Sequence, residues 1–144
     1  MSQHEFDHAI EAYRRALPAF LHGDPEPILD LYSRRDDVTL ANPLGPPVRG
    51  RARVEQAIRT AATNFEAGTV AFEEVSRYGT PDLGYAVWLE PNDVRLAGTD
   101  DTARISLRVT MVFRREDEAD GWRIAHRHAD PITTARPVST AIES

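Results

Sequence analysis

The chain has 144 residues, 41% of them hydrophobic and 28% charged, and a net charge of -6. This composition is typical of one folded domain and excludes a disordered chain, and no apolar run approaches the length that a bilayer requires. All seventeen basic residues are Arg and lie scattered, so we expect no nucleic-acid partner and no membrane association. The absence of Cys and Lys excludes disulfides, thiol catalysis and internal Schiff bases. Because no secretory signal is visible, we expect a cytoplasmic location.

Helices are predicted in the first part of the chain. The first is long and ends at Gly23, because apolar residues recur at helical spacing at Phe6, Ile10, Tyr13, Leu17 and Phe20. Asp24-Pro25 then predicts the N-cap and first turn of a short helix that runs through Tyr32. A third helix is predicted from about Arg51 to Glu66 by the same spacing of apolar residues.

Strands are predicted in the second part of the chain. A short strand at Val38–Leu40 precedes the loop 42–47, whose three prolines exclude it from a central sheet. Four longer strands, joined by turns, cover Thr69–Tyr78, Leu83–Leu96, Ala103–Arg115 and Trp122–Asp130. Helices followed by hairpin-joined strands predict an α+β fold, in which a curved antiparallel sheet wraps around the long N-terminal helix. We expect one domain over 1–131 and a loose C-terminal tail over 132–144.

The last predicted strand carries the densest group of chemically active side chains. Regular alternation places five of them on one face: Trp122, Ile124, His126, His128 and Asp130. A face that begins with two large apolar side chains is normally buried, so the imidazoles and the carboxylate are predicted to line an enclosed pocket. The other interpretation is a hydrogen-bonded rim or an interface.

These side chains suit acid–base catalysis. His128 or His126 could shuttle a proton, Asp130 could fix the imidazole tautomer, and Arg108 could hold an enolate or a carboxylate. This arrangement fits isomerisation, cyclisation or dehydration of a small carbonyl compound. Trp88 and Tyr32 could supply an aromatic wall, although large aromatic side chains are more often ordinary core.

Two metal-like patterns do not predict a metal site. His4-Glu5-Phe6-Asp7-His8 matches the zinc-protease pattern, but it lies at the start of a terminal helix with no clear third ligand downstream. His126, His128 and Asp130 offer three ligands on one strand face, but no fourth is recognisable. We therefore expect no metal and no other cofactor.

The sequence does not determine which face of the strand 103–115 points toward the cavity. Either Ile105, Leu107, Val109, Met111 and Phe113 or Ser106, Arg108, Thr110 and Val112 could face the cavity. Both faces look at least partly covered, as a homodimer formed on the outer face of the sheet, or a cavity wall, would require.

The order of elements and several local strings resemble the nuclear transport factor 2-like superfamily, which includes ketosteroid isomerases and SnoaL-like polyketide cyclases. The resemblance spans nearly the whole chain and looks like the SnoaL-like branch. It rests on His22-Gly23-Asp24, Asp36-Asp37-Val38-Thr39, Asn42-Pro43, Arg49-Gly50, Leu107-Arg108-Val109-Thr110, and Gly121-Trp122-Arg123-Ile124 running into His126-Arg127-His128. It implies a cone-shaped, cystatin-like α+β barrel with an internal hydrophobic pocket, and commonly a homodimer.

The resemblance argues against steroid isomerisation. Where ketosteroid isomerases place a carboxylate base, this chain has Asn42, which cannot accept a proton at neutral pH. Their oxyanion-donating tyrosine would fall near Ala16, one turn after Tyr13, and their protonated acid falls near Thr110. Tyr13, Asn42 and Thr110 therefore join Trp88 and Tyr32 as predicted ligand-binding positions.

The sequence thus predicts a small-molecule pocket protein. As an enzyme it would be a cofactor-independent isomerase, cyclase or dehydratase that uses His-based acid–base catalysis. The alternative is a non-catalytic module that binds a ligand or forms a homodimer.

Overall fold

The structure is a computed structural model that describes residues 2–117 and 121–143, the first three of them by backbone alone. Its helices are α1 (Ser2–Phe20), α2 (Glu26–Leu29) and α3 (Arg51–Ala62). The turn after α1 closes at Gly23, where φ is +89° and a Cβ would stand 3.1 Å from the Phe65 carbonyl oxygen. Glycine accepts this conformation without strain, so the predicted end of the first helix is confirmed.

Seven strands form one sheet: β1 (Thr39–Ala41), β2 (Val48–Arg49), β3 (Phe65–Val70), β4 (Glu73–Gly79), β5 (Leu83–Leu96), β6 (Thr102–Arg115) and β7 (Trp122–Asp130). They run in the order β2-β1-β7-β6-β5-β3, and β4 also pairs with β5. Every pairing is antiparallel except that of β1 with β7. The long hairpin of β5 and β6 is therefore the centre of the sheet.

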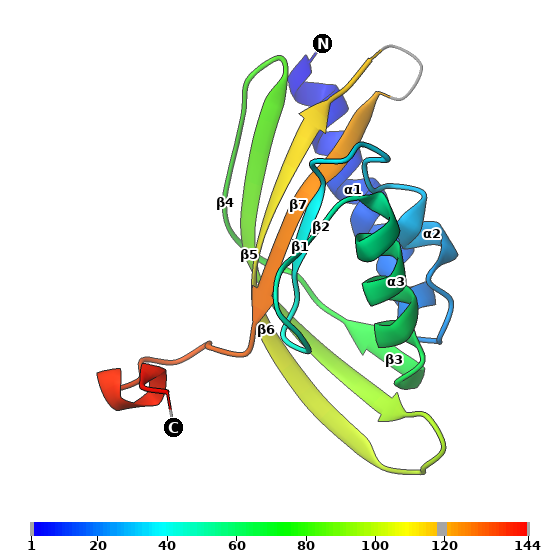
Figure 1. The fold of residues 1–144 in the computed structure, drawn as a ribbon, viewed down its shortest axis with the longest axis vertical. Helices are drawn as coiled ribbons and strands as arrows, with labels where there is room; N and C mark the ends of the chain where they lie inside the picture. Colours follow the sequence, from blue (N-terminus) through cyan, green and yellow to red (C-terminus); the bar gives the residue numbers. More distant parts are fainter. Residues whose placement is uncertain (1, 118–120, 144) are drawn as a thin grey trace.

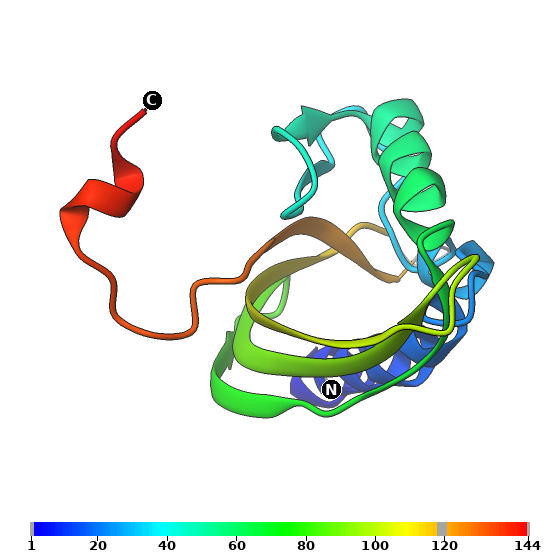
Figure 2. The ribbon, with the colours of Figure 1, turned by 90° about the horizontal axis from the view of Figure 1, so that it is seen from below.

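The sheet curves around the helices, as Figures 1 and 2 show. The apolar face of α1 packs against the inner face of the sheet. The ring of Phe6 lies 5.7 Å from that of Phe113 and 5.4 Å from that of Trp122, and the ring of Tyr13 lies 6.0 Å from that of Trp88. The predicted α+β fold, with a curved sheet around the N-terminal helix, is confirmed.

The region after α3 differs from the prediction. The helix ends at Ala62 instead of Glu66, because the side chains of Thr63 and Asn64 donate hydrogen bonds to the Thr60 and Ala61 carbonyls and so satisfy acceptors of its last turn. The strand predicted over 69–78 is two strands, β3 and β4, which pair with opposite halves of β5. Two-residue β2 lies just after the proline-rich loop and was not predicted.

Residues 131–143 follow β7 as an exposed segment that contains one turn of 3-10 helix, η1 (Val138–Ala141). This segment projects away from the helices and from the rest of the chain in both views (Figures 1 and 2). Among the described residues, no helix combines the length and the apolar character needed to cross a membrane.

Candidate functional site

A cavity of about 350 Å³ lies between the helices and the inner face of the sheet. Its wall is mostly apolar, with side chains from α1, α2, α3, β5 and β6: Leu17, Phe20, Leu21, Ile28, Ile58, Val94, Ile105 and Leu107. Pro43, Leu44 and Pro131 lie at its exposed margin. Since Ile105 and Leu107 line the cavity, the odd-numbered residues of β6 face inward. The cavity is large enough for a small organic molecule.

The cavity has one polar end, formed by Arg127 of β7 and Glu90 of β5. Their side chains are 8% and 2% exposed, and Nη2 of Arg127 lies 3.2 Å from Oε2 of Glu90. Further hydrogen bonds satisfy the pair: Trp88 Nε1 donates to Glu90 at 3.2 Å, Asn92 Nδ2 donates to it at 3.3 Å, and Arg127 Nη1 donates to Asn42 Oδ1 at 2.6 Å. Two buried charges persist only when they are paired and hydrogen-bonded in this way.

Two donors at this end have no acceptor. Arg127 Nε is buried without a hydrogen-bond partner among the described residues, and within the same part of the chain nothing accepts from the hydroxyl of Tyr32. An unpaired buried donor costs about 1–3 kcal/mol. The polar end therefore has more donors than acceptors.

Tyr13 and Tyr32 both line the cavity and both stay protonated at neutral pH. Burial raises the pKa of Tyr32 to about 12, and it raises the pKa of Tyr13 well above its usual range, although the nearby Arg127 guanidinium opposes the shift in each case. A neutral phenol can donate its proton in a hydrogen bond. Both side chains can therefore serve as donors to a ligand oxygen.

A β-bulge in β7 changes the direction of the predicted catalytic side chains. Val112 pairs with His126, but the next residue of β6, Phe113, pairs with Ile124, so Ala125 has no partner in the ladder. An extra residue in one strand reverses the faces that its side chains occupy beyond that point.

Before the bulge the even-numbered residues of β7 point inward, and after it the odd-numbered residues do. Ile124 is in the core before it, and Arg127 and Ala129 are buried after it. The prediction of one shared face for Trp122, Ile124, His126, His128 and Asp130 is therefore wrong. His126, His128 and Asp130 lie on the outer face and are not among the residues that line the cavity.

Three of the predicted catalytic side chains do meet, but on the outer face. Asp130 accepts a hydrogen bond from Arg108 Nε at 2.6 Å and lies 2.9 Å from His128 Nε2. Burial alone would raise the pKa of Asp130, but hydrogen bonds from Arg108, His128 and the Ile132 N–H lower it to about 2. The Arg108 and His128 side chains are about half exposed, so this cluster is open to solvent.

His126 stands slightly apart from this cluster. Its Nδ1 lies 2.7 Å from Thr39 Oγ1 of the neighbouring strand. Burial, and then the charge of His128, lower its pKa below the usual value. The neutral imidazole is therefore favoured in the folded protein.

The predicted ligand-binding residues divide between the two faces. Tyr13, Tyr32 and Asn42 line the cavity. Trp88 is fully buried behind Glu90, to which it donates, and so supports the polar end from outside the cavity lining. Thr110 pairs with His128 on the outer face.

Sequence reasoning missed Glu90, Asn92 and Arg127. A signal existed for the first two, because alternation along β5 places them on the same face as Trp88. Arg127 had no such signal, since its inward direction depends on the bulge. Among the described side chains no group of three or more His, Asp or Glu could hold a metal ion. The side chain of His4 lies outside the described residues.

The chain matches known proteins in family and in fold. A family model described as the SnoaL-like domain matches residues 10–133. No curated protein sequence matches the chain.

Three solved structures illustrate the fold. A nuclear transport factor 2-like protein from Salmonella enterica is 17% identical, with a TM-score of 0.78 and 94% of each chain covered. A candidate dehydratase of the same family from Streptomyces avermitilis is 23% identical, with a TM-score of 0.74 and 91% of this chain and 96% of that chain covered. A candidate association domain of calcium/calmodulin-dependent protein kinase type II from Thiobacillus denitrificans is 26% identical, with a TM-score of 0.67 and 87% and 93% covered. With its curved sheet, its inner cavity and this match over most of its length, the chain belongs to the SnoaL-like domain family.

Proposed function

We propose that this protein binds a neutral, mostly apolar small molecule in the cavity, with an oxygen of the ligand facing Arg127 and Tyr32. The observation that supports this most strongly is the excess of donors at the polar end. A carbonyl oxygen would accept a hydrogen bond from the Tyr32 hydroxyl beside Arg127, while the ring carbons of the ligand would contact the apolar wall.

The charge balance of the site favours a neutral ligand over an anion. Glu90 already neutralises Arg127 within the cavity wall. A ligand carboxylate would add a third buried charge next to Glu90, and that charge would have no cation of its own. Ketones, esters and amides therefore fit the site better than carboxylates.

The proposal favours binding over catalysis because the protein already uses the Glu90 carboxylate as a hydrogen-bond acceptor. Both of its carboxylate oxygens already accept hydrogen bonds. These contacts direct both oxygens at donors of the protein instead of at a ligand atom. His-based acid–base catalysis has no support from the cavity, because no described imidazole lines it.

An isomerase, cyclase or dehydratase is the second candidate function. Arg127 and Tyr13 resemble an arrangement that could stabilise an enolate oxygen, and Glu90 would then carry the proton. One solved structure of the same fold is a candidate dehydratase. In this form of the proposal the reaction needs no cofactor.

Ligand binding is tested by thermal shift and by NMR titration with a bicyclic ketone and the carboxylate of the same ring system. We expect the ketone to bind and the carboxylate to bind much more weakly. Tyr32→Phe should weaken ketone binding up to about tenfold, since one neutral hydrogen bond contributes about 0.5–1.5 kcal/mol. His128→Ala, on the outer face, is the matched control and should leave binding unchanged. Tighter binding of the carboxylate would contradict the proposal.

Turnover is tested separately by hydrogen–deuterium exchange at the α-carbons of the bound ketone, which reports enolisation without knowledge of the natural substrate. The binding proposal predicts exchange at the uncatalysed rate. Accelerated exchange that is lost in Glu90→Gln, and kept in His128→Ala, would establish the second candidate instead.

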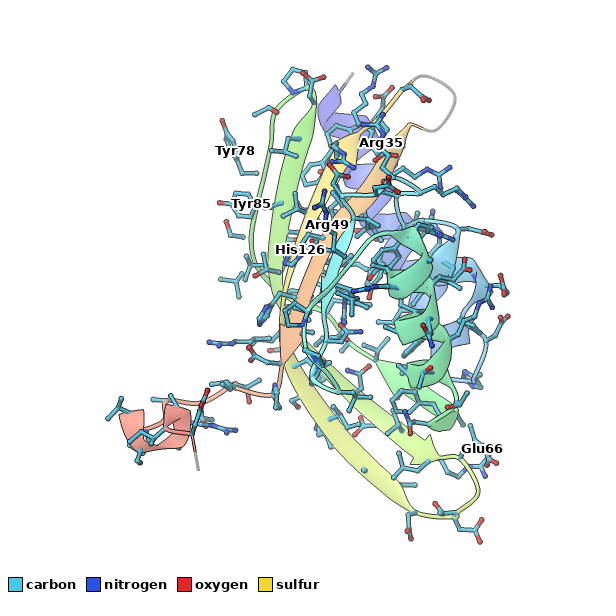
Figure 3. The ribbon with its side chains drawn as sticks, in the orientation of Figure 1. Arg35, Arg49, Glu66, Tyr78, Tyr85 and His126 are labelled. Atoms are coloured by element: carbon cyan, nitrogen blue, oxygen red, sulfur yellow. The ribbon has the colours of Figure 1, made fainter. Side chains whose placement is uncertain are left out.

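We also propose that two copies associate through the outer face of the sheet. Tyr78 of β4 and Tyr85 of β5 form a cross-strand pair there, with ring centroids 6.4 Å apart and exposed fractions of 62% and 41%. Leu83, two residues before Tyr85, is 49% exposed. Both tyrosines point away from the helices (Figure 3). Adjacent exposed aromatic and aliphatic side chains are typical of an interface core.

A further inference from the structure

The segment Pro131–Glu143, here called the arm, makes no hydrogen bond or ion pair with any described residue before Asp130. The Ile132 N–H donates to Asp130 Oδ1, and the remaining hydrogen bonds of the arm lie within it. All of its residues are exposed, and it stands clear of its own domain in two perpendicular views (Figures 1 and 2). Beyond Pro131, which lies at the margin of the cavity, the arm is therefore unsupported by the protomer to which it belongs.

The arm nevertheless has a defined shape. Pro137 precedes η1, and the backbone N–H and hydroxyl of Thr140 both donate to the Pro137 carbonyl, at 3.0 and 2.8 Å. This turn presents Val138 and Ile142, which are 82% and 70% exposed. Two aliphatic side chains on one ordered turn are unfavourable in water and favourable against another apolar surface.

The place where the arm leaves the sheet, and its length, limit which surfaces of a second copy it can contact. It leaves the sheet at the end of β7 and projects on the side opposite the helices, which is also the side to which Tyr78 and Tyr85 point (Figures 1 and 3). Thirteen residues span at most about 45 Å when extended, and the sheet, six strands across because β3 and β4 share one edge of β5, is roughly 29 Å wide. The arm is therefore long enough to cross a facing sheet.

We propose that the arm of one copy packs on the outer sheet face of a second copy, with Val138 and Ile142 against the surface around Tyr78 and Tyr85. This inference rests on the proposed association through the outer face and adds a reciprocal contact to it. Each arm would cover apolar side chains that its own protomer leaves exposed, and a two-fold axis would give both arms the same contact.

The energetic part of the proposal is tested by sedimentation equilibrium on three proteins: the full chain, a truncation after Pro131, and Val138→Asp with Ile142→Asp. We expect the full chain to dimerise and both variants to raise the dissociation constant at least about tenfold. Tyr85→Glu, which changes the face and leaves the arm intact, should also dissociate the dimer. If Tyr85→Glu dissociates the dimer while the truncation has no effect, the arm proposal is wrong and the outer-face association stands. A monomeric full chain would overturn both.

The geometric part is tested by disulfide trapping, which is unambiguous because the chain has no Cys. Ser139→Cys places a thiol on the arm, and Ser76→Cys places one on the outer face beside Tyr78. The two single variants, one of them labelled with ¹⁵N, are mixed under mild oxidation. We expect the mixed disulfide to form faster than with Ala52→Cys, an exposed position on α3. Equal rates at positions 76 and 52 would overturn the proposal. The double variant Ser76→Cys with Ser139→Cys gives a second check, because a disulfide that forms only within one chain, and never between two chains, would also overturn it.

Discussion

Arg127 and Glu90 form an ion pair that joins β7 to β5 across the intervening strand β6, at the polar end of the cavity. The pair is almost completely buried, and its hydrogen bonds involve Trp88, Asn92 and Asn42. Since these contacts fix the donors that face the cavity, stability and ligand binding depend on the same side chains.

Breaking this pair should destabilise the protein strongly. In Arg127→Met the Glu90 carboxylate stays buried without a cation, which typically costs about 3–5 kcal/mol. Urea unfolding measures the change. The double variant Arg127→Met with Glu90→Leu should recover much of the loss, because no uncompensated charge remains.

The matched control for that prediction is Arg108→Met, which removes the partner of Asp130 on the outer face. Arg108 is about half exposed, so the loss should be much smaller. Similar losses at positions 108 and 127 would contradict the importance assigned to the buried pair.

Gly84→Ala should destabilise the core by about 1–3 kcal/mol, as overpacking generally does. A Cβ at Gly84 would stand 2.6 Å from two atoms of the Phe6 ring, which is itself packed against Phe113 and Trp122. Gly45→Ala is the control, because a Cβ there meets nothing within 4 Å. Equal thermal stability of the two variants would show that α1 does not press on β5 at this point.

Alkaline pH should destabilise the protein through its two buried tyrosines. The pKa of Tyr32 is raised to about 12 and that of Tyr13 is raised well above its usual range. The stability that they contribute is fully present below the unfolded value of about 10, and it is lost as the pH rises through the folded values. Phenolate absorbance and circular dichroism should therefore change together, and Tyr32→Phe should lose less stability at high pH. Ionisation of all four tyrosines near pH 10 without unfolding would refute this.

Acid pH should destabilise the protein through His126. Its pKa in the folded state lies below the usual value, so its contribution is present above about pH 6.5 and is lost as the pH falls through the lower folded pKa. NMR titration of the ring protons should give a midpoint below 6.5. His126→Gln should remove this part of the acid sensitivity, and a midpoint above 6.5 would contradict the assignment.

Helices and strands could be predicted wherever the spacing of apolar residues along the chain was enough to define them. Helical spacing from Phe6 to Phe20 and the turn at Gly23 located α1, and alternation over Leu83–Leu96 located β5. The division of the predicted strand 69–78 into β3 and β4 could not be predicted, because it depends on how two short strands share the length of β5. Such pairing involves residues that are distant in sequence.

The candidate site was harder to predict because one unpaired residue changes it. With regular alternation His126 and His128 would face inward, but the bulge at Ala125 turns them outward and turns Arg127 inward. Bulges depend on the partner strand and leave no clear mark in the sequence of β7. Tyr13, Tyr32 and Asn42, predicted as ligand-binding positions, do line the cavity, and their role there stays a prediction.

The most direct test of the proposed function is an NMR titration with the bicyclic ketone that follows the side-chain Nε–H signal of Arg127 and the ring protons of His126 and His128. If the ligand binds in the cavity with its oxygen at the polar end, the Arg127 signal should shift on binding while the ring protons of both histidines stay unchanged. Shifts confined to His126 and His128 would place the ligand on the outer face and contradict the proposed function.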